Sequence, residues 1–197
     1  EQARREVPAF LQGHAEKVNV AVVGNSGVGK SLFVNAVRGV RPGEPGWAPV
    51  GVTETTMEPT PFEFPDEAHV LLWDIPGAGT AAFPLCDYIR TFGLRHFDVA
   101  VVLAAGRFSE TELLISSELR QAGKAMLLVR TKVDLDIANE EADGGRAPME
   151  TKRAIREDLA RGGAPGAYLV SSRQLLEHDF DRLCRDLRAA CRAAAGQ

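Results

Sequence analysis

A glycine-rich stretch near the amino terminus has the composition and spacing of a phosphate-binding loop. Residues 24–31 match the pattern G-x-x-x-x-G-K-[ST] at every fixed position. Glycines let such a backbone turn so that successive N–H groups converge on a phosphate, and the following helix adds its positive dipole end. Lys30 would place its charge on the β- and γ-phosphates, and the Ser31 hydroxyl would be a ligand of Mg²⁺. The residues expected to contact the nucleotide here are Gly24, Asn25, Ser26, Gly27, Val28, Gly29, Lys30, Ser31 and Leu32.

A second short motif, D-x-x-G, follows an apolar stretch in the first half of the chain. It runs from Asp74 to Gly77 and comes directly after Trp73. Asp74 would hold Mg²⁺ through a water molecule, and the Gly77 N–H would contact the γ-phosphate. The motif is weak by itself, because Asp and Gly are common in turns. Its place after the third expected strand of a chain with a phosphate loop favours the functional interpretation over a plain turn.

A T-K-x-D motif at a strand end indicates which base is bound. Asp134 closes the motif, and its carboxylate would accept hydrogen bonds from the ring N1–H and the exocyclic amine of guanine. Adenine lacks this pair of donors, so the motif predicts GTP or GDP and disfavours an ATPase. Lys132 would lie along the base, whereas Thr131 replaces the usual Asn and keeps a hydroxyl in place of an amide. Ser171 and Ser172, after a short strand, are weaker candidates for the last base-contacting loop.

One residue that a Ras-type hydrolytic mechanism needs is missing. Ala78 follows Gly77 at the position where Ras-like GTPases carry a glutamine that orients the attacking water. A methyl side chain neither donates nor accepts a hydrogen bond. The catalytic group is therefore expected from the first switch, from a partner or from both. A nucleotide-regulated binding module with little GTPase activity is the alternative function.

The elements that must position these motifs alternate along the chain. Strands are expected at 18–23, 58–64, 69–74, 99–104, 125–130 and 168–170, and helices at 31–37, 109–121, 149–161 and 177–192. A polar stretch with Gly144, Gly145 and Pro148 is expected before the third helix. This alternation predicts an α/β fold of the P-loop NTPase class, a Ras-like G domain with a mostly parallel central sheet and helices on both faces. Every motif falls at the carboxyl ends of strands, where such sheets bind ligands.

Composition and charge argue against several other classes. The chain has 197 residues, of which 45% are hydrophobic and 25% charged, as expected for one globular domain. Its net charge of -4 gives no electrostatic reason to expect a nucleic-acid partner. No apolar run approaches the ~20 residues of a membrane-spanning helix. Cys86, Cys184 and Cys191 lack metal-ligand spacing and are expected to be reduced thiols in a cytoplasmic setting.

With its motifs in this order, the sequence resembles the immunity-related GTPases, the interferon-inducible family of vertebrates. The resemblance covers nearly the whole chain and is clearest at 51–58 (GVTETTME), 73–79 (WDIPGAG) and 129–136 (VRTKVDLD). Thr131 in place of Asn is usual in that family. The family divides into branches with Lys or Met in the phosphate loop, and Lys30 places this chain with the lysine-bearing branch.

The resemblance implies a domain plan and a setting. The G domain would span 18–193, with 1–17 as an extension that is a possible remnant of a helical domain, and 194–197 as a tail. Members of the lysine-bearing branch act as effectors on membranes. In this family, attachment would depend on elements of the helical domain, which are absent from this chain. The resemblance also implies a role in cell-autonomous defence against intracellular pathogens.

The resemblance further implies a homodimer or oligomer through the nucleotide faces, in which the contact activates hydrolysis. Glu54 matches a switch glutamate of the family that would position the attacking water or contact the neighbouring nucleotide; a solvated loop carboxylate is the alternative. A threonine should complete the Mg²⁺ shell, and Thr56 is the candidate, although spacing alone also allows Thr53 and Thr55. Arg107, near the same face, is either a surface arginine or a group that acts on the partner's site.

Overall fold

The protein is built around one six-stranded sheet with the strand order β2-β3-β1-β4-β5-β6. The computed structural model describes residues 7–51, 56–80 and 83–196. All strand pairs are parallel except β2–β3, which is an antiparallel pair at one edge. The strands are β1 (Val18–Gly24), β2 (Thr60–Phe64), β3 (Glu67–Asp74), β4 (Val99–Ala104), β5 (Ala125–Arg130) and β6 (Tyr168–Leu169). The mostly parallel sheet predicted from the sequence is confirmed.

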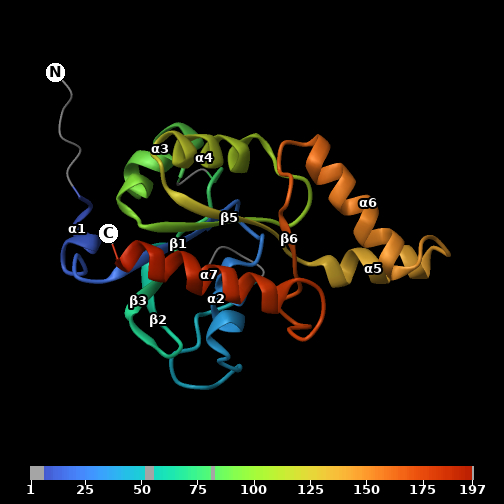
Figure 1. Ribbon diagram of the computed structural model, residues 1–197, viewed down its shortest axis with the longest axis horizontal. Coiled ribbons are helices and arrows are strands. Elements are labelled where there is room, and N and C mark those ends of the chain that lie inside the picture. Colours follow the sequence, from blue (N-terminus) through green and yellow to red (C-terminus); the bar gives the residue numbers. More distant parts are fainter. Residues whose placement is uncertain (1–6, 52–55, 81–82, 197) are drawn as a thin grey trace.

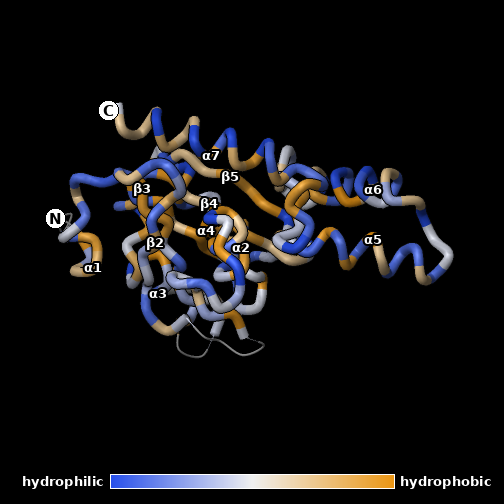
Figure 2. The backbone as a smooth tube through the Cα atoms, turned by 90° about the horizontal axis from the view of Figure 1, so that it is seen from below, coloured by the Kyte–Doolittle hydropathy of each residue, from blue (hydrophilic) through white to orange (hydrophobic). Residues whose placement is uncertain are grey.

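Helices cover both faces of this sheet (Figure 1). One face carries α2 and α7, and the other carries α3, α4 and the short helix η1. In Figure 2 the strands are the most hydrophobic part of the backbone and lie between α7 and α3. The helices are α1 (Ala9–Gln12), α2 (Lys30–Arg38), α3 (Leu85–Thr91), η1 (Leu94–His96), α4 (Glu110–Gln121), α5 (Val133–Ala142), α6 (Pro148–Arg161) and α7 (Phe180–Ala195).

The central strands are apolar on both sides, because each side packs under a helical layer. Every residue of β1 is buried. Val20 and Val22 face the α2–α7 layer, whereas Ala21 and Val23 face the α3–α4 layer. From Val20 to Val23 the strand is apolar, and this alternation is what a parallel sheet buried on both faces requires.

Helix α7 closes one face of the sheet and is tied to the β2–β3 hairpin. Leu183 is fully buried against the strands. The Arg188 guanidinium lies 4.7 Å from the centroid of the Phe64 ring, and Arg192 pairs with Glu67 at 2.8 Å. The helix therefore covers apolar surface with one face and contacts the hairpin with the arginines beside that face.

Among the helices longer than four residues, the sequence prediction missed α3 and α5. Residues 133–142, expected as motif and polar connection, form α5, and α3 lies in what was expected to be loop. Val133 is the one residue of α5 classed as buried, so the helix has little of the apolar periodicity that sequence analysis detects. Asp134 and Asp136 lie in its first turn, where their negative charges interact favourably with the positive end of the helix dipole and stabilise the helix. The sequence analysis assigned no helix to residues 133–142, and the structure adds one there.

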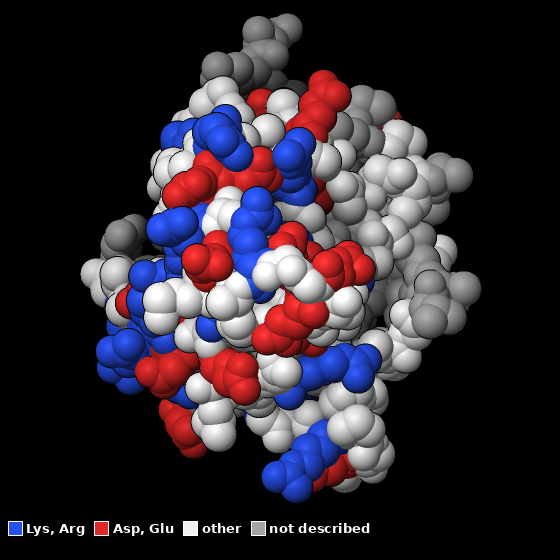
Figure 3. Space-filling model, turned by 90° about the vertical axis from the view of Figure 1, so that its right-hand side faces the viewer, with Lys and Arg blue, Asp and Glu red and all other residues white. Residues whose placement is uncertain are grey.

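Helices α5 and α6 pack together beyond β6 at one end of the sheet (Figure 1). On this end acidic and basic side chains are intermixed (Figure 3). Arg146 pairs with Glu140 at 3.4 Å, and Arg153 with Glu157 at 3.8 Å. Charges of both signs therefore alternate over this surface. Within the described ranges, no helix is both long and apolar enough to cross a membrane.

The two described cysteine side chains are free thiols of α7. Cys191 is buried and Cys184 partly buried. Burial raises the pKa of Cys191 to about 12 and that of Cys184 to about 11. Both groups are therefore protonated and poorly nucleophilic at neutral pH.

Candidate functional site

The phosphate loop links the end of β1 to the start of α2, as the motif predicts. Gly24 has φ of 148°, and a Cβ there would overlap the carbonyl oxygen of Leu103. A Cβ on Gly77 would lie 2.7 Å from the Ser26 Cα, so the D-x-x-G turn packs directly against the phosphate loop. An isolated bridge between Asn25 and Ala78 joins the same two segments. Two motifs about fifty positions apart in sequence are thus side by side.

Lys30 points its ammonium group back into this loop. Its side chain is buried, and Nζ donates to the carbonyl oxygens of Asn25 at 3.1 Å and Gly24 at 3.3 Å. The positive charge of Lys30 therefore lies inside the loop that the motif predicts to bind phosphate.

Three oxygen-bearing side chains converge where the motifs place the metal. The Ser31 Oγ donates to Asp74 Oδ2 at 2.6 Å, and the Thr56 Oγ1 donates to the same oxygen at 3.0 Å. The two hydroxyl oxygens are 3.3 Å apart. Of the threonines left open by spacing, Thr56 reaches this cluster, whereas Thr53, Thr55 and the candidate Glu54 lie outside the described residues.

The chemistry of this cluster fits Mg²⁺. Asp74 is 2% exposed, and its Oδ1 has no hydrogen-bond partner within the described part of the chain. Burial raises the pKa of Asp74, against the lowering effect of the bonds from Ser31 and Thr56 and of the Lys30 charge. A buried carboxylate with a free oxygen beside two hydroxyls is an oxygen ligand set of the kind Mg²⁺ takes, with substrate phosphates supplying further ligands.

A cavity of about 520 Å³ lies beside the phosphate loop, at the carboxyl ends of β5 and β6. Its size is that of an ordinary small-molecule site. Predicted residues that line it are Gly27, Val28, Gly29, Leu32, Thr131, Lys132, Asp134, Ser171 and Ser172. Four further lining residues, Val50, Gly51, Leu135 and Arg173, were not singled out from the sequence. The structure therefore gathers the three base-motif residues and the two serines around one cavity.

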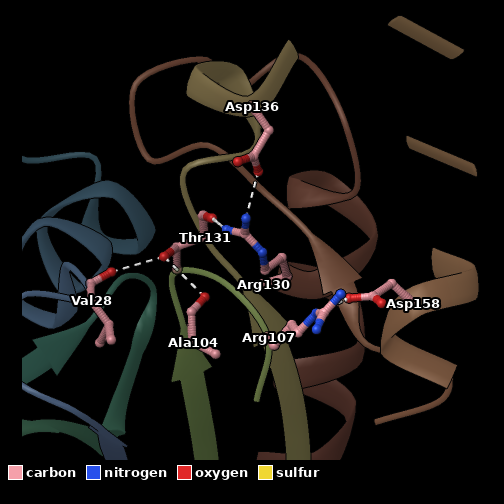
Figure 4. Close-up of polar contacts among 7 residues, drawn as sticks. All are labelled: Val28, Ala104, Arg107, Arg130, Thr131, Asp136 and Asp158. Carbon is pink, nitrogen blue, oxygen red and sulfur yellow. Dashed lines mark hydrogen bonds and ion pairs between the residues drawn. The ribbon is translucent and has the colours of Figure 1, made fainter. Parts of the chain in front are cut away.

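The base motif is bonded directly to the phosphate loop. Thr131 Oγ1 lies 2.8 Å from the carbonyl oxygen of Val28 and 3.3 Å from that of Ala104 (Figure 4). Lys132 has φ of 60°, and its Nζ donates to the Gly27 carbonyl at 2.9 Å. The sequence placed Lys132 along the base but gave no sign that its ammonium bonds to the other loop.

Behind the base motif, Arg130 holds the start of α5. Its buried guanidinium donates to the Thr131 carbonyl oxygen and to Asp136 Oδ2, the latter at 2.6 Å (Figure 4). Burial lowers the pKa of Arg130 and raises that of Asp136, and their mutual attraction opposes both shifts. Sequence reasoning missed this pair, although a charged residue that ends an apolar strand is a signal that it needs a partner.

Arg107 has a partner within its own chain. Its Nε donates to Asp158 Oδ2 of α6 at 2.8 Å (Figure 4), and this bond is the main reason that the pKa of Asp158 is lowered. The arginine side chain is still largely exposed. The pairing favours the surface interpretation of Arg107 over a role at a partner's site.

A capping box at the start of α4 also contacts the phosphate loop. Glu112 is 1% exposed and accepts the Ser109 N–H that caps the helix. It also accepts the Asn25 N–H at 3.2 Å, while the Asn25 amide donates to Ser109 Oγ at 3.0 Å. The S-x-x-E spacing at 109–112 was a usable signal for the cap. Its contact with the phosphate loop depends on the tertiary fold.

Ala78 is buried beside Gly24, to whose carbonyl its N–H donates at 3.1 Å. Its methyl group fills space under the D-x-x-G turn and offers no hydrogen bond to a water molecule. The position that orients water in Ras-like proteins is therefore apolar in this chain.

Comparison with known proteins identifies a matching family of GTPases and several relatives that are named as GTPases. A family model described as interferon-inducible GTPase (IIGP) matches residues 9–193. Interferon-inducible GTPase 1 of Mus musculus is 34% identical over 183 residues, which cover 86% of this chain and 44% of that protein. Interferon-inducible GTPase 5 of Bos taurus is 35% identical over 190 residues, which cover 90% of this chain and 41% of that protein. The chain thus spans less than half the length of these relatives.

Solved structures show the same fold at lower identity. A variant of Era from Aquifex aeolicus, solved with GDP and AlF4-, has a TM-score of 0.58 at 18% identity, and the match covers 88% of this chain and 56% of that one. A probable GTP-binding protein engB has a TM-score of 0.53 at 16% identity, covering 89% and 99%. The fold is that of a P-loop G domain, as predicted. From the family match over almost its whole length, this chain belongs to the interferon-inducible, immunity-related GTPase family.

Proposed function

We propose that this chain binds GTP and GDP together with Mg²⁺ and hydrolyses GTP to GDP and phosphate. One arrangement carries the proposal: the oxygen cluster around Asp74, the phosphate loop and the cavity at Asp134 follow one another along the carboxyl edge of the sheet, at the ends of β3, β1 and β5. That order matches a metal ion, the phosphates that it would accompany and the base. The names of the relatives, which are GTPases, support the same conclusion.

Each group has a role that its chemistry suits. Lys30 would neutralise charge on the β- and γ-phosphates, and the backbone N–H groups of the phosphate loop would bind their oxygens. Ser31 and Thr56 would hold Mg²⁺ directly and Asp74 through water; the ion would neutralise charge between the β- and γ-phosphates. Asp134 would accept two hydrogen bonds from guanine.

The attacking water needs a group that Ala78 does not supply. We infer that a second copy of the chain, docked through its nucleotide face, completes the site, with Glu54 as this chain's own candidate. We also propose a cytoplasmic role in cell-autonomous defence against intracellular pathogens, as the resemblance to the immunity-related GTPases implies; its support among the relatives is that they are named as interferon-inducible GTPases.

GTP turnover per molecule, followed across a wide range of protein concentration with Mg²⁺ present, tests this proposal. A rate that climbs with concentration is expected if two copies complete the site. Tight GTP binding with a flat rate near zero would contradict hydrolysis by self-association and favour a nucleotide-regulated binding module. Competition by ATP, measured in the same assay, should be far weaker than competition by GDP because of Asp134.

A further inference from the structure

Thr131 stands where an asparagine is usual, and the two side chains differ in the number of hydrogens they can donate. An amide carries two N–H hydrogens and a carbonyl oxygen, whereas a hydroxyl carries one hydrogen. An amide can therefore serve two acceptors at once. A threonine must choose between them.

The geometry shows how Thr131 uses its one hydrogen. The side chain is 2% exposed, and both oxygens near its Oγ1 are backbone carbonyls, which only accept. The Ala104 carbonyl, at 3.3 Å, already accepts the Thr131 N–H at 2.8 Å. The Val28 carbonyl, at 2.8 Å, is the better placed acceptor for the hydroxyl. The hydrogen is thus committed to the phosphate loop.

The chemistry of guanine places one of its acceptors on the same side. If Asp134 binds the N1–H and the exocyclic amine, the five-membered ring lies on the opposite edge of the base. That ring carries N9, through which the ribose leads to the phosphates, and also N7, which has a lone pair and no hydrogen. N7 therefore faces the phosphate-loop side of the cavity, where Thr131 lines the wall.

We propose that Thr131 is a positioning residue that fixes the base motif to the phosphate loop and leaves N7 of the base unread. The pocket then recognises guanine by the edge that Asp134 contacts and accepts guanine nucleotides altered at position 7. This inference rests on the proposed binding of guanine nucleotides. It adds which part of the base the site ignores and which residue decides it.

The direct test is equilibrium binding of GTP and of 7-deaza-GTP, in which a C–H replaces N7, to the unmodified chain. We expect the two dissociation constants to agree within about twofold, since a lost neutral hydrogen bond would cost about fivefold. Binding of 7-deaza-GTP that is weaker than that of GTP by about fivefold or more would overturn the inference. If GTP itself fails to bind, the proposed function fails instead, so the two failures are distinguishable.

A Thr131→Asn variant sharpens the test, because it restores the second hydrogen. It should bind 7-deaza-GTP about fivefold more weakly than GTP, the size of one neutral hydrogen bond. A variant that binds GTP well and shows no such preference contradicts the inference that the second amide hydrogen is what this chain lacks.

The positioning role has its own pair of variants. Thr131→Val keeps the shape but leaves the Val28 carbonyl without its donor, and it should weaken GTP and GDP alike by about tenfold. Thr131→Ser keeps the hydroxyl and should stay within about twofold of the unmodified chain. The ratio between GTP and 7-deaza-GTP should not change in either variant, because neither side chain offers a hydrogen to N7. Unchanged affinity in a folded Thr131→Val protein would overturn the positioning role; if that variant does not fold, the unmodified chain still decides the inference about N7.

Discussion

The two ends of the nucleotide site are built in different ways. At the phosphate end, Lys30 and Asp74 are buried and come from β1–α2 and β3, which are neighbours in the sheet. At the base end, Asp134 is half-buried and Lys132 exposed, at the rim of an open cavity. The phosphate end is held by close backbone packing of Gly77 on Ser26 and by side-chain bonds such as that of Ser31 to Asp74. The base end is held by side chains that cross to a loop about a hundred positions earlier in the sequence.

This difference separates two kinds of sensitivity. A change at the phosphate end removes charge or metal ligands from a compact buried cluster, so it should abolish the reaction. A change at the base end should redirect specificity or loosen the loop while leaving the phosphate site formed. Substitutions at Lys30, Asp134, Arg130 and Asp74 test that separation.

Lys30→Ala should reduce GTP turnover by more than about a hundredfold, because a buried charge aimed at the phosphates is lost. Lys124→Ala, at the opposite edge of the sheet before β5, is the matched control and should leave turnover unchanged. Turnover should be measured at saturating GTP with Mg²⁺. A Lys30→Ala rate within tenfold of the unmodified chain would show that the reaction does not depend on this group.

Asp134→Asn should weaken GTP binding by about a hundredfold, because two hydrogen bonds to a charged acceptor are replaced by a mismatched amide. The same variant should bind xanthine nucleotides better than guanine nucleotides, since xanthine presents a carbonyl where guanine has its amine. Asp143→Asn, just beyond the far end of α5, is the control. Competition binding with GTP and XTP measures both; an unchanged preference for GTP would mean that another group selects the base.

Arg130→Ala should lower the free energy of unfolding by about 3 kcal/mol, because it leaves the Thr131 carbonyl and the partly buried Asp136 without their donor. The exposed pair of Arg153 and Glu157 provides the contrast, and Arg153→Ala should cost less than about 0.5 kcal/mol. Urea unfolding measures both values. Equal losses in the two variants would show that burial of Arg130 contributes nothing to the stability of the base end.

Asp74→Asn should stabilise the metal-free chain slightly while abolishing its Mg²⁺-dependent activity. Burial raises the pKa of Asp74, so between the ordinary value of about 3.9 and the raised one the folded state holds a proton that the unfolded state has lost. Stability contributed by this group is therefore present at low pH and is lost as pH rises through that window. Removing the charge should raise the melting temperature by about 2–4 °C at neutral pH, the shift expected for about 1 kcal/mol.

Thermal unfolding without Mg²⁺, measured from pH 4 to pH 8, checks this expectation. Asp143→Asn again serves as the control and should melt like the unmodified chain. A lower melting temperature for Asp74→Asn at neutral pH would mean that the bonds from Ser31 and Thr56 outweigh the cost of burying the charge.

The fold could be predicted to the extent that its elements carry local patterns. β1 and β4 are runs of apolar, mostly β-branched residues, and both lie where the sequence predicts. α5 was missed because its packing depends on α6 and on the ion pair of Asp136 with Arg130, which no periodicity within 133–142 reports. Gly144, Gly145 and Pro148, which the sequence analysis noted, lie after the end of α5 at Ala142.

For the candidate site, motifs predicted which residues gather but not how they are held. The placement of Asp74 beside Ser31 follows from parallel strands whose carboxyl ends meet at one edge. The bonds from Thr131 and Lys132 to the phosphate loop depend on side-chain geometry across the fold, and a motif read along the chain contains no such distance. Spacing alone left Thr53, Thr55 and Thr56 open; the structure brings the Thr56 hydroxyl to Asp74, whereas Thr53 and Thr55 lie outside the described residues.

The position of α7 also matters while the chain is being synthesised. A ribosome adds about 5–20 residues per second, so β1, β3 and β4 are able to pair before Phe180–Ala195 has been made. During that interval the apolar surface that α7 covers, which includes Val20 and Val22 of β1 and Phe33 of α2, lacks its cover. An unfinished chain would present this apolar surface to chaperones or to other nascent chains. Completion of one late helix therefore ends the period in which the nascent domain is most prone to aggregate.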